Sequence, residues 1–302
     1  MTLPSQREIS IRTREGNALA DSRFSSSVAL PSKASSLALP TFVGIGVMRA
    51  ATSWAYFCLR EHPEVFVSKD KELHFFNLNY EKGCSWYASN FQEGLEFKAR
   101  GEVTPNYLDT ERAMARMAET IPDVRLFVML RDPAERTYSH YHFLHERFKG
   151  MSFREACNHM PGIVNLSLYT NQLRQVYRYY PKDQVAVFLY DDVKFQPAVV
   201  LRDLFRFIGV DDTFRPPSTN KFFNRTVLPN GQRALEKVGL GWLVQLARRT
   251  PIGEWLRNRA ASSGASKNKG GDEDHYRHLK EFFRSDVMGL QDLIQRDLTA
   301  WL

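Results

Sequence analysis

Three short stretches of the sequence carry polar and charged side chains in patterns typical of ligand binding or catalysis. The first is VGIGVMRAATSW (Val43–Trp54), in which an apolar run meets the cation Arg49 and the hydroxyls Thr52 and Ser53. A strand that turns into a helix offers unpaired N–H groups and a partial positive charge to an anion. The Arg49 guanidinium adds a planar fork that suits phosphate oxygens. The stretch therefore predicts a phosphate-binding loop, although an ordinary strand, turn and capped helix has a similar sequence.

The spacing of this loop differs from that of the nucleotide hydrolases. Those enzymes carry G-x-x-x-x-G-K-[ST], whereas Ala50 and Ala51 stand here where Gly and Lys would be, and the basic residue precedes the small pair. No G-x-G-x-x-G dinucleotide fingerprint follows the strand. A nucleotide kinase or NTPase is therefore the alternative enzyme class, and the missing G-K-[ST] argues against it.

The second stretch is SKDKELHFFN (Ser68–Asn77). It places Glu72 directly after Lys71 and two residues before His74. A carboxylate in such company is a plausible general base. The simpler interpretation is a surface Glu–Lys pair.

The third stretch is VMLRDPAERTYSHYHF (Val128–Phe143). Arg131 ends an apolar run, and Ser139 follows eight residues later, about two helical turns on. Residues at the carboxyl ends of parallel strands face the ligand crevice, so this Arg and Ser are candidates for holding a second phosphate. Asp132-Pro133 also has the sequence of a simple helix start.

The pattern of apolar runs predicts the elements that must bring these stretches together. Apolar, β-branched runs indicate buried strands at 41–47, 65–67, 124–130 and 184–190. Composition and the placement of proline and glycine indicate helices at 52–60, 111–119, 133–147, 168–180 and 197–208. Alternating strands and helices predict an α/β fold built from βαβ units, with a parallel sheet covered on both faces.

The 302 residues are enough for one large α/β domain. Residues 1–38, rich in Ser, Ala and Arg, are expected to be a disordered or weakly ordered lead. We expect a single domain over residues 39–302. Within it, residues 259–274 are expected to form a Gly/Ser/Lys loop, followed by an amphipathic C-terminal helix.

Charge and cysteine content set broad limits on function. The net charge of +7 fits an anionic ligand or surface, or simply solubility. Cys58, Cys84 and Cys157 form no C-x-x-C, so we predict no metal site and a reducing, cytoplasmic location. The apolar runs are shorter than the ~20 residues of a membrane span. A basic module that binds nucleic acid or anionic membrane is the third alternative, but no recognition helix or basic run supports it.

Together and in this order, these stretches resemble the sulfotransferase family, whose donor is 3′-phosphoadenosine 5′-phosphosulfate (PAPS). The likeness is strongest to the carbohydrate sulfotransferases that act on heparan-type glycosaminoglycans and to their bacterial relatives. It covers about residue 40 to the C-terminus and extends to GCSWY, GEVTPNYL, SLYTNQLRQVYRYYP and KFFNRT. The resemblance implies a P-loop-type three-layer α/β/α fold and in-line transfer of a sulfuryl group, without a metal, to a hydroxyl or amine of a carbohydrate or small molecule.

The resemblance also assigns roles to individual residues. Glu72 corresponds to the catalytic base, with His74 as a neighbouring active-site histidine and Arg49 beside the bridging oxygen. Donor binding falls to Arg49, Ala50, Ala51, Thr52, Ser53, Trp54, Arg131, Ser139, Lys269 and Gly270. In this set Trp54 would stack on adenine, and Arg131, Ser139, Lys269 and Gly270 would hold the 3′-phosphate.

Four further residues are candidate contacts for the acceptor, although the aromatic ones could equally belong to the core: Lys71, Asn77, Trp86 and Tyr107. Two positions depart from the family pattern. Ala51 stands in a small pair that usually contains a Gly, where its methyl group could crowd the donor. Val103 stands where the glycosaminoglycan enzymes have Lys, which removes a cation suited to a sulfated or uronic polymer. The cysteine pair and membrane anchor of Golgi-resident relatives are not found in the sequence.

Overall fold

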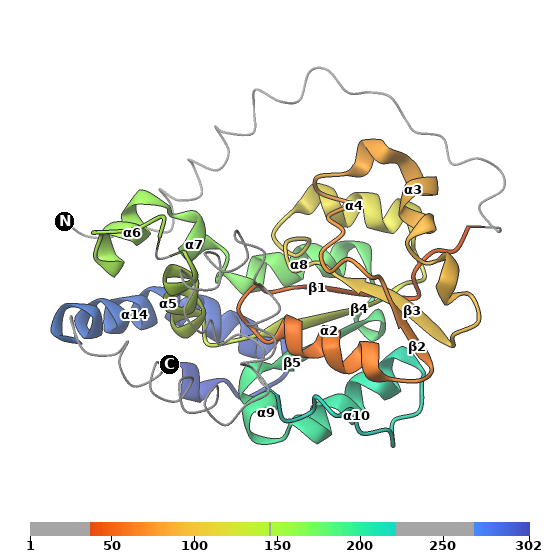
Figure 1. Cartoon of the computed structure of the whole chain (residues 1–302). Helices are drawn as coiled ribbons and strands as arrows, with labels where there is room; N and C mark the ends of the chain where they lie inside the picture. The colour runs from red at the N-terminus through yellow and green to blue at the C-terminus, as the bar shows by residue number, and fades with distance from the viewer. Residues whose placement is uncertain (1–36, 145, 222–268) are drawn as a thin grey trace, which may run out of the picture.

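A parallel β-sheet forms the centre of the computed structural model, which describes residues 37–144, 146–221 and 269–302 (Figure 1). Within these residues the sheet has five strands: β1 (Phe42–Gly46), β2 (Val65–Val67), β3 (Ala99–Val103), β4 (Arg125–Leu130) and β5 (Val185–Leu189). They lie in the order β2-β3-β1-β4-β5, and every neighbouring pair is parallel. The predicted α/β class with a central parallel sheet is confirmed.

Burial explains why β1 and β4 occupy the inner positions of the sheet. Every residue of β1 is buried, and so are all residues of β4 after Arg125. Strands covered by helices on both faces need such continuous apolar sequences. Gly44 permits close packing inside this core, because a Cβ there would lie 2.4 Å from the Phe127 ring.

Strand β3 was not among the predicted strands. Its sequence ARGEV contains Arg, Gly and Glu, which are poor signals for a buried strand. Gly101 nevertheless allows β3 to lie against β1, since a Cβ there would come 2.2 Å from the Phe42 carbonyl oxygen. The carboxylate of Glu102 is satisfied by hydroxyl donors inside the core.

Helices cover both faces of the sheet and give the fold three layers (Figure 1). The helices of the described residues are α2 (Thr52–Glu61), α3 (Gly83–Ser89), α4 (Glu111–Thr120), α5 (Pro133–Phe143), α6 (Phe153–His159), α7 (Gly162–Asn165), α8 (Tyr169–Tyr179), α9 (Tyr190–Phe195), α10 (Pro197–Ile208) and α14 (Lys269–Ile294). In Figure 1, α2 and α10 lie on one side of the sheet, and α4 and α8 on the other. Helix α14 packs against α5 and α8. No helix among these residues combines the length and apolar character needed to cross a bilayer.

Local sequence explains where the helices around the site begin and end. Asp132 caps α5 by accepting hydrogen bonds from the N–H groups of Ala134 and Glu135, at 2.8 and 3.1 Å, and Pro133 takes the first helical position. Gly209 ends α10 with a left-handed φ of 84°. The predicted helix over 133–147 is too long, because α5 ends at Phe143.

The two ends of the predicted domain fall largely outside the described residues. The expected lead at 1–38 overlaps the description only at residues 37 and 38, and the expected loop at 259–274 only from residue 269 onward. For that last part the loop prediction is wrong, because the backbone of α14 is helical from Lys269. The predicted C-terminal amphipathic helix is confirmed, and its apolar face buries Leu279, Phe283, Val287 and Leu290.

Candidate active site

The loop between β1 and α2 presents an open helix start at the carboxyl edge of the sheet. Its backbone turns sharply, with left-handed φ angles of 74° at Arg49 and 68° at Ala51. Ala51 occupies the N-cap position of α2 and has no side-chain oxygen with which to cap the helix. The first N–H groups of α2 therefore receive no side-chain cap, which suits them to an anionic ligand.

Arg49 connects this loop to helix α5. Its Nε donates a hydrogen bond to Ser139 Oγ at 3.1 Å, across 90 residues of sequence. Arg131, which directly follows β4, donates from Nη1 to the Arg49 carbonyl oxygen at 3.4 Å. Three residues predicted to bind one ligand through different phosphates are thus in direct contact.

Arg131 is held in place by groups on three elements. Its Nε and Nη2 donate to Glu135 Oε2 at 3.1 and 3.0 Å, and its guanidinium carbon lies 4.6 Å from the centre of the Tyr190 ring. The Tyr169 hydroxyl donates to the Arg131 carbonyl oxygen at 2.9 Å. Such contacts lower the conformational entropy that a ligand must remove on binding.

The predicted general base lies in a group of polar side chains after β2. Lys71 Nζ lies 2.5 Å from Glu72 Oε1, and His74 Nε2 lies 3.5 Å from Glu72 Oε2. His74 Nδ1 lies 3.3 Å from Asn77 Oδ1, which orients the imidazole. The Glu72 side chain is 32 % exposed, so it is accessible to a ligand and yet partly shielded from water.

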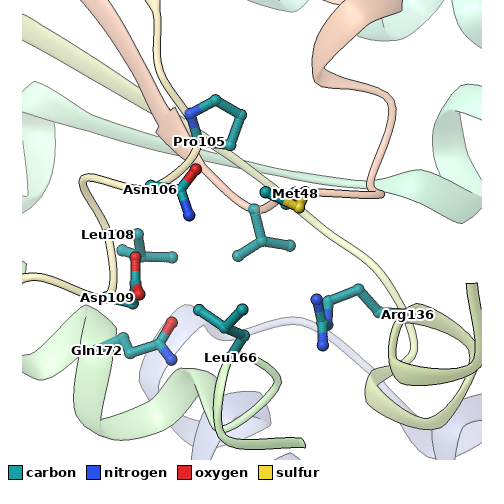
Figure 2. Close-up of a pocket in the computed structure, with 9 residues that line it drawn as sticks. Met48, Pro105, Asn106, Leu108, Asp109, Arg136, Leu166 and Gln172 are labelled. Atoms are coloured by element: carbon teal, nitrogen blue, oxygen red, sulfur yellow. The ribbon is translucent and has the colours of Figure 1, made fainter. Parts of the chain in front are cut away.

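The segment that carries Glu72 (residues 68–77, the base segment) is connected through Asn106 to a small hollow beside the loop between β1 and α2 (the donor loop). The Asn77 amide donates to the Asn106 carbonyl oxygen at 3.5 Å, and Asn106 lines a small hollow together with Met48 of the donor loop. Figure 2 shows Met48 and Asn106 on one side of this hollow and Arg136, from α5, facing it from another. The segment predicted to carry the base and the loop predicted to bind the donor thus lie at the same edge of the sheet.

A buried arginine lies in the wall formed by α5. The Arg136 side chain is fully buried and donates to Ser167 Oγ at 2.5 Å and to the Ile163 carbonyl oxygen. Burial lowers the pKa of Arg136 to about 10, and the pKa of Arg49 is also lowered, by burial and then by the nearby Arg131. An anionic ligand beside these groups would favour their charged forms further.

A carboxyl group with a raised pKa lies on the opposite wall of the hollow. Asp109 faces the space that Arg136 and Gln172 also line (Figure 2). Residue 109 as a whole is exposed, but partial loss of water around its carboxyl group raises the pKa of Asp109 to about 6, and its own backbone N–H and then Arg136 oppose this shift in part.

Comparison with known proteins assigns this arrangement to a family. The model of the sulfotransferase domain matches residues 41–237. The chain belongs to the sulfotransferase domain family. The match includes the donor loop, the base segment and the Arg131–Ser139 segment.

Individual relatives agree with the family match. The chain is 32 % identical over 185 residues to mouse heparan sulfate glucosamine 3-O-sulfotransferase 3A1, covering 57 % of this chain and 46 % of the relative. It is 35 % identical over 117 residues to the membrane-associated sulfotransferase kil1 of Dictyostelium discoideum, covering 38 % of this chain and 25 % of the relative. The chain thus spans less than half the length of these two curated relatives.

A solved structure shows the same fold. The sulfotransferase from Alicyclobacillus acidocaldarius superposes with a TM-score of 0.65 at 22 % identity, covering 88 % of this chain and 99 % of the other. The expected P-loop-type fold is therefore confirmed.

The structure corrects one predicted acceptor contact of this chain. The Tyr107 side chain is fully buried, and its hydroxyl donates to Glu102 and accepts from the Phe75 N–H. Tyr107 therefore supports the site from within the core and does not face an acceptor. Trp86 is half-buried, with Lys82 Nζ 4.4 Å from its ring centre, and its acceptor contact stays a prediction.

Two further donor assignments also stay predictions. Trp54 is only 2 % exposed, and its indole N–H donates to the Thr219 carbonyl oxygen at 2.9 Å, so a stacked adenine would require this environment to open. Lys269 and Gly270 begin helix α14, and of these two residues only the backbone is described.

Sequence patterns missed several residues of the site. Tyr190 directly follows β5, just as Arg131 follows β4, so the strand-end rule applied to every strand would have found it. Glu102 and Arg136 look like surface charges in the sequence, and only the three-dimensional structure shows that both are fully buried.

Proposed function

We propose that this sulfotransferase moves the sulfuryl group of PAPS to a hydroxyl or amine of a carbohydrate or small-molecule acceptor. A sugar hydroxyl is the first candidate. The observation that carries the proposal is the contact of Arg49 with Ser139, beside Arg131. This contact brings together the two segments that would bind the two phosphate groups of such a donor, at the sheet edge that also carries Glu72.

The donor would bind through charge and through the open helix start. The N–H groups of α2, with the Thr52 and Ser53 hydroxyls, suit the 5′-phosphosulfate, as does Arg49. Arg131 and Ser139 suit the 3′-phosphate, with Glu135 giving way to it or turning toward solvent. The family's use of PAPS and these contacts support the assignment.

The transfer step follows from the chemistry of the groups at this edge. The acceptor oxygen attacks sulfur, its S–O bond forms as the S–O bond to the 5′-phosphate breaks, and Glu72 takes the acceptor's proton. The products are a sulfate ester and adenosine 3′,5′-bisphosphate (PAP). Arg49 and the loop N–H groups stabilise the negative charge that develops on the leaving phosphate. Lys71, at 2.5 Å, and His74, at 3.5 Å, orient the Glu72 carboxylate.

A carbohydrate acceptor is supported by the names of the relatives. Several of them are heparan sulfate glucosamine 3-O-sulfotransferases. Val103 is fully buried here, so this position offers neither a cation nor an exposed contact to a polyanion. A short or weakly charged sugar therefore fits better than a long sulfated polymer.

Replacement of the base tests the proposal. Glu72→Gln keeps the size of the side chain but removes the proton acceptor, which typically costs 10²–10⁴-fold in rate. We expect transfer from [³⁵S]PAPS to a panel of glucosamine-containing oligosaccharides and small hydroxyl compounds to fall by about that factor. Binding of PAP, measured by calorimetry, should change less than about threefold.

Glu93→Gln is the matched control, because Glu93 also pairs with a lysine at 2.5 Å, as Glu72 does, but at an exposed site. It should leave both transfer and binding unchanged. Transfer at the wild-type rate by Glu72→Gln would refute the role of Glu72 as base. Failure of the wild-type protein to bind PAP would refute the whole proposal.

A further inference from the structure

The segment that carries Glu72 has a backbone that its own sequence does not favour. Residues 71–74 belong to no helix or strand. Glu72 and His74 have left-handed φ angles of 68° and 51°, which residues with a Cβ avoid. Such a conformation persists only where the surroundings determine it. The contacts that hold the segment therefore decide where the Glu72 carboxylate and the His74 imidazole lie.

Three consecutive backbone N–H groups of this segment donate to side chains from β3 and the loop after it. The Leu73 N–H donates to the Glu102 carboxylate. The His74 N–H donates to Thr104 Oγ1 at 3.4 Å. The Phe75 N–H donates to the Tyr107 hydroxyl at 2.8 Å. The conformation of the segment is thus set by side chains and not by a backbone ladder.

All of these acceptors are connected through one buried carboxylate. Glu102 Oε1 accepts from the hydroxyls of Tyr87 and Tyr107 at 2.8 and 3.1 Å, and Oε2 accepts from Thr104 Oγ1 at 2.6 Å. With the Leu73 N–H, four donors surround an acceptor-only group that has about four lone-pair sites. Glu102, Tyr107 and Thr104 are each fully buried, and so is Tyr87.

The number of donors makes the carboxylate difficult to replace. An amide at position 102 would have one oxygen and an NH₂ group that is itself a donor. At least one of the four donors would then face another donor and lose its partner. A buried donor left without a partner destabilises the conformation that depends on it.

We propose that Glu102 is a positioning residue of this sulfotransferase, which holds the strained Glu72–His74 segment in its working conformation through Thr104, Tyr107 and the Leu73 N–H. The inference rests on the proposed role of Glu72 as the base. Tyr87 completes the network, and its ring stacks on Phe75 with centres 4.4 Å apart. Glu102 is fully buried, so it would act on the reaction only through Glu72 and His74.

Amide hydrogen exchange tests the positioning without any knowledge of the acceptor. In Glu102→Gln the amides of Leu73, His74 and Phe75, followed by NMR, should exchange at least about tenfold faster. Tyr87→Phe and Thr104→Val should give smaller increases and serve as the second test if Glu102→Gln does not fold. Tyr180→Phe is the matched control, because its hydroxyl is equally buried but donates to the Ile121 carbonyl oxygen, outside the network.

Steady-state kinetics test the consequence for the reaction. With [³⁵S]PAPS and a glucosamine-containing heparan oligosaccharide as the probe, Glu102→Gln should lower kcat about 10–100-fold. The KM for PAPS and the affinity for PAP should change less than about threefold, because the donor loop is not part of the network. A residue that supported only the fold would lower donor binding and thermal stability together with kcat.

Two results would overturn the inference. One is unchanged amide exchange and kcat in Glu102→Gln; the other is an equal loss of kcat in Tyr180→Phe, which would indicate general loosening of the core. If the wild-type protein binds PAP but transfers nothing to the probe, the proposed acceptor class fails. The exchange rates would still decide whether Glu102 holds the segment.

Discussion

At the scale of the residue, the backbone conformation of the donor loop limits which residue types can occupy position 51. The φ of 68° at Ala51 costs a residue with a Cβ about 1–2 kcal/mol. Glycine would remove that cost, but it would also remove a methyl group that is 97 % buried, which is worth about 0.8 kcal/mol. Burial of the methyl group offsets much of the backbone cost, so an alanine is tolerated where the family pattern has a glycine.

Valine at this position should not be tolerated. A β-branched side chain is a strong outlier at positive φ, and the added methyl groups would overpack a buried position. We expect Ala51→Val to lower the free energy of unfolding by about 2 kcal/mol or more, and Ala51→Gly to change it by no more than about 1 kcal/mol. Urea denaturation measures both. Equal stability of the valine variant and the wild type would contradict the left-handed geometry of the loop.

His140 gives the protein a predictable response to acid. Its side chain is buried beside Arg136, whose Nη1 lies 3.3 Å from His140 Nδ1. A guanidinium can only donate, so the imidazole must accept and remain neutral. Burial, then Arg136 and Arg49, lower the pKa of His140 to about 3. Because the folded pKa is depressed, this contribution to stability is complete above about pH 6.5 and is lost as the pH falls toward 3.

Removal of this histidine should therefore flatten the acid limb of the stability curve. His140→Asn keeps an acceptor for Arg136 but has no group that titrates there. Between pH 7 and pH 4.5 the wild type should lose about 1–3 kcal/mol of unfolding free energy more than this variant. The exposed His159→Asn should follow the wild type in urea titrations at both pH values. Parallel curves for wild type and His140→Asn would show that His140 is not held neutral.

At the scale of the element, helix α14 supplies the cap of helix α8. Leu168, the N-cap residue of α8, makes no side-chain cap. Asp286 of α14 accepts instead from the N–H groups of Tyr169 and Thr170 at 2.9 and 3.2 Å. The Thr170 hydroxyl donates back to the Asp286 carbonyl oxygen at 2.7 Å. Since Tyr169 also holds the Arg131 carbonyl, this cap connects the C-terminal helix to the donor site.

Loss of the cap should reduce both stability and donor binding. Burial raises the pKa of Asp286 to about 6, so the group is ionised at pH 7.5. At that pH, Asp286→Ala should lower the free energy of unfolding by about 1–2 kcal/mol. It should also weaken PAP binding about two- to fivefold through Tyr169. Asp292→Ala, at an exposed position of the same helix, should do neither. A fully stable Asp286→Ala would show that α8 needs no cap.

The same scale shows which parts of the fold can be predicted from sequence. Strands β1 and β4 are continuous apolar runs, so their positions follow from hydrophobicity alone. Strand β3 was not predicted because its burial depends on two residues. Gly101 permits close approach to β1, and the charge of Glu102 is satisfied by residues distant in sequence. Local patterns cannot show a partner that the fold supplies.

The candidate site also has some features that the sequence predicts and others that only the fold supplies. The contact between Arg49 and Ser139 is expected, because both lie at the ends of buried strands or in the helix that follows. The left-handed φ of Glu72 and His74 has no sequence signal, since neither residue is a glycine. Tyr107 was assigned to the acceptor because an aromatic residue near a site suits either a cleft or the core, and only its burial decides.

At the scale of the whole molecule, the donor site joins parts of the chain that are far apart in sequence. The loop after β1 and helix α5 meet through Arg49 and Ser139, and α14 packs against α5 and α8. A ligand that binds only this assembled arrangement stabilises the entire domain. At 100 times its Kd, PAP should add about 2.7 kcal/mol and raise Tm by about 5 °C. Mg-ATP should raise Tm much less, because the loop lacks the G-K-[ST] of nucleotide hydrolases.

A variant of Arg131 tests how much of this stabilisation comes from the 3′-phosphate of PAP. Arg131→Ala should lose most of the Tm increase given by PAP, because the guanidinium suits the 3′-phosphate. It should lose much less of the increase given by adenosine 5′-phosphosulfate, which has no 3′-phosphate. Arg178→Ala, in which an exposed arginine is removed, should keep both. Equal losses for the two nucleotides would contradict the assignment of Arg131 to the 3′-phosphate. A larger Tm increase from Mg-ATP than from PAP would favour a nucleotide kinase over a sulfotransferase that uses PAPS.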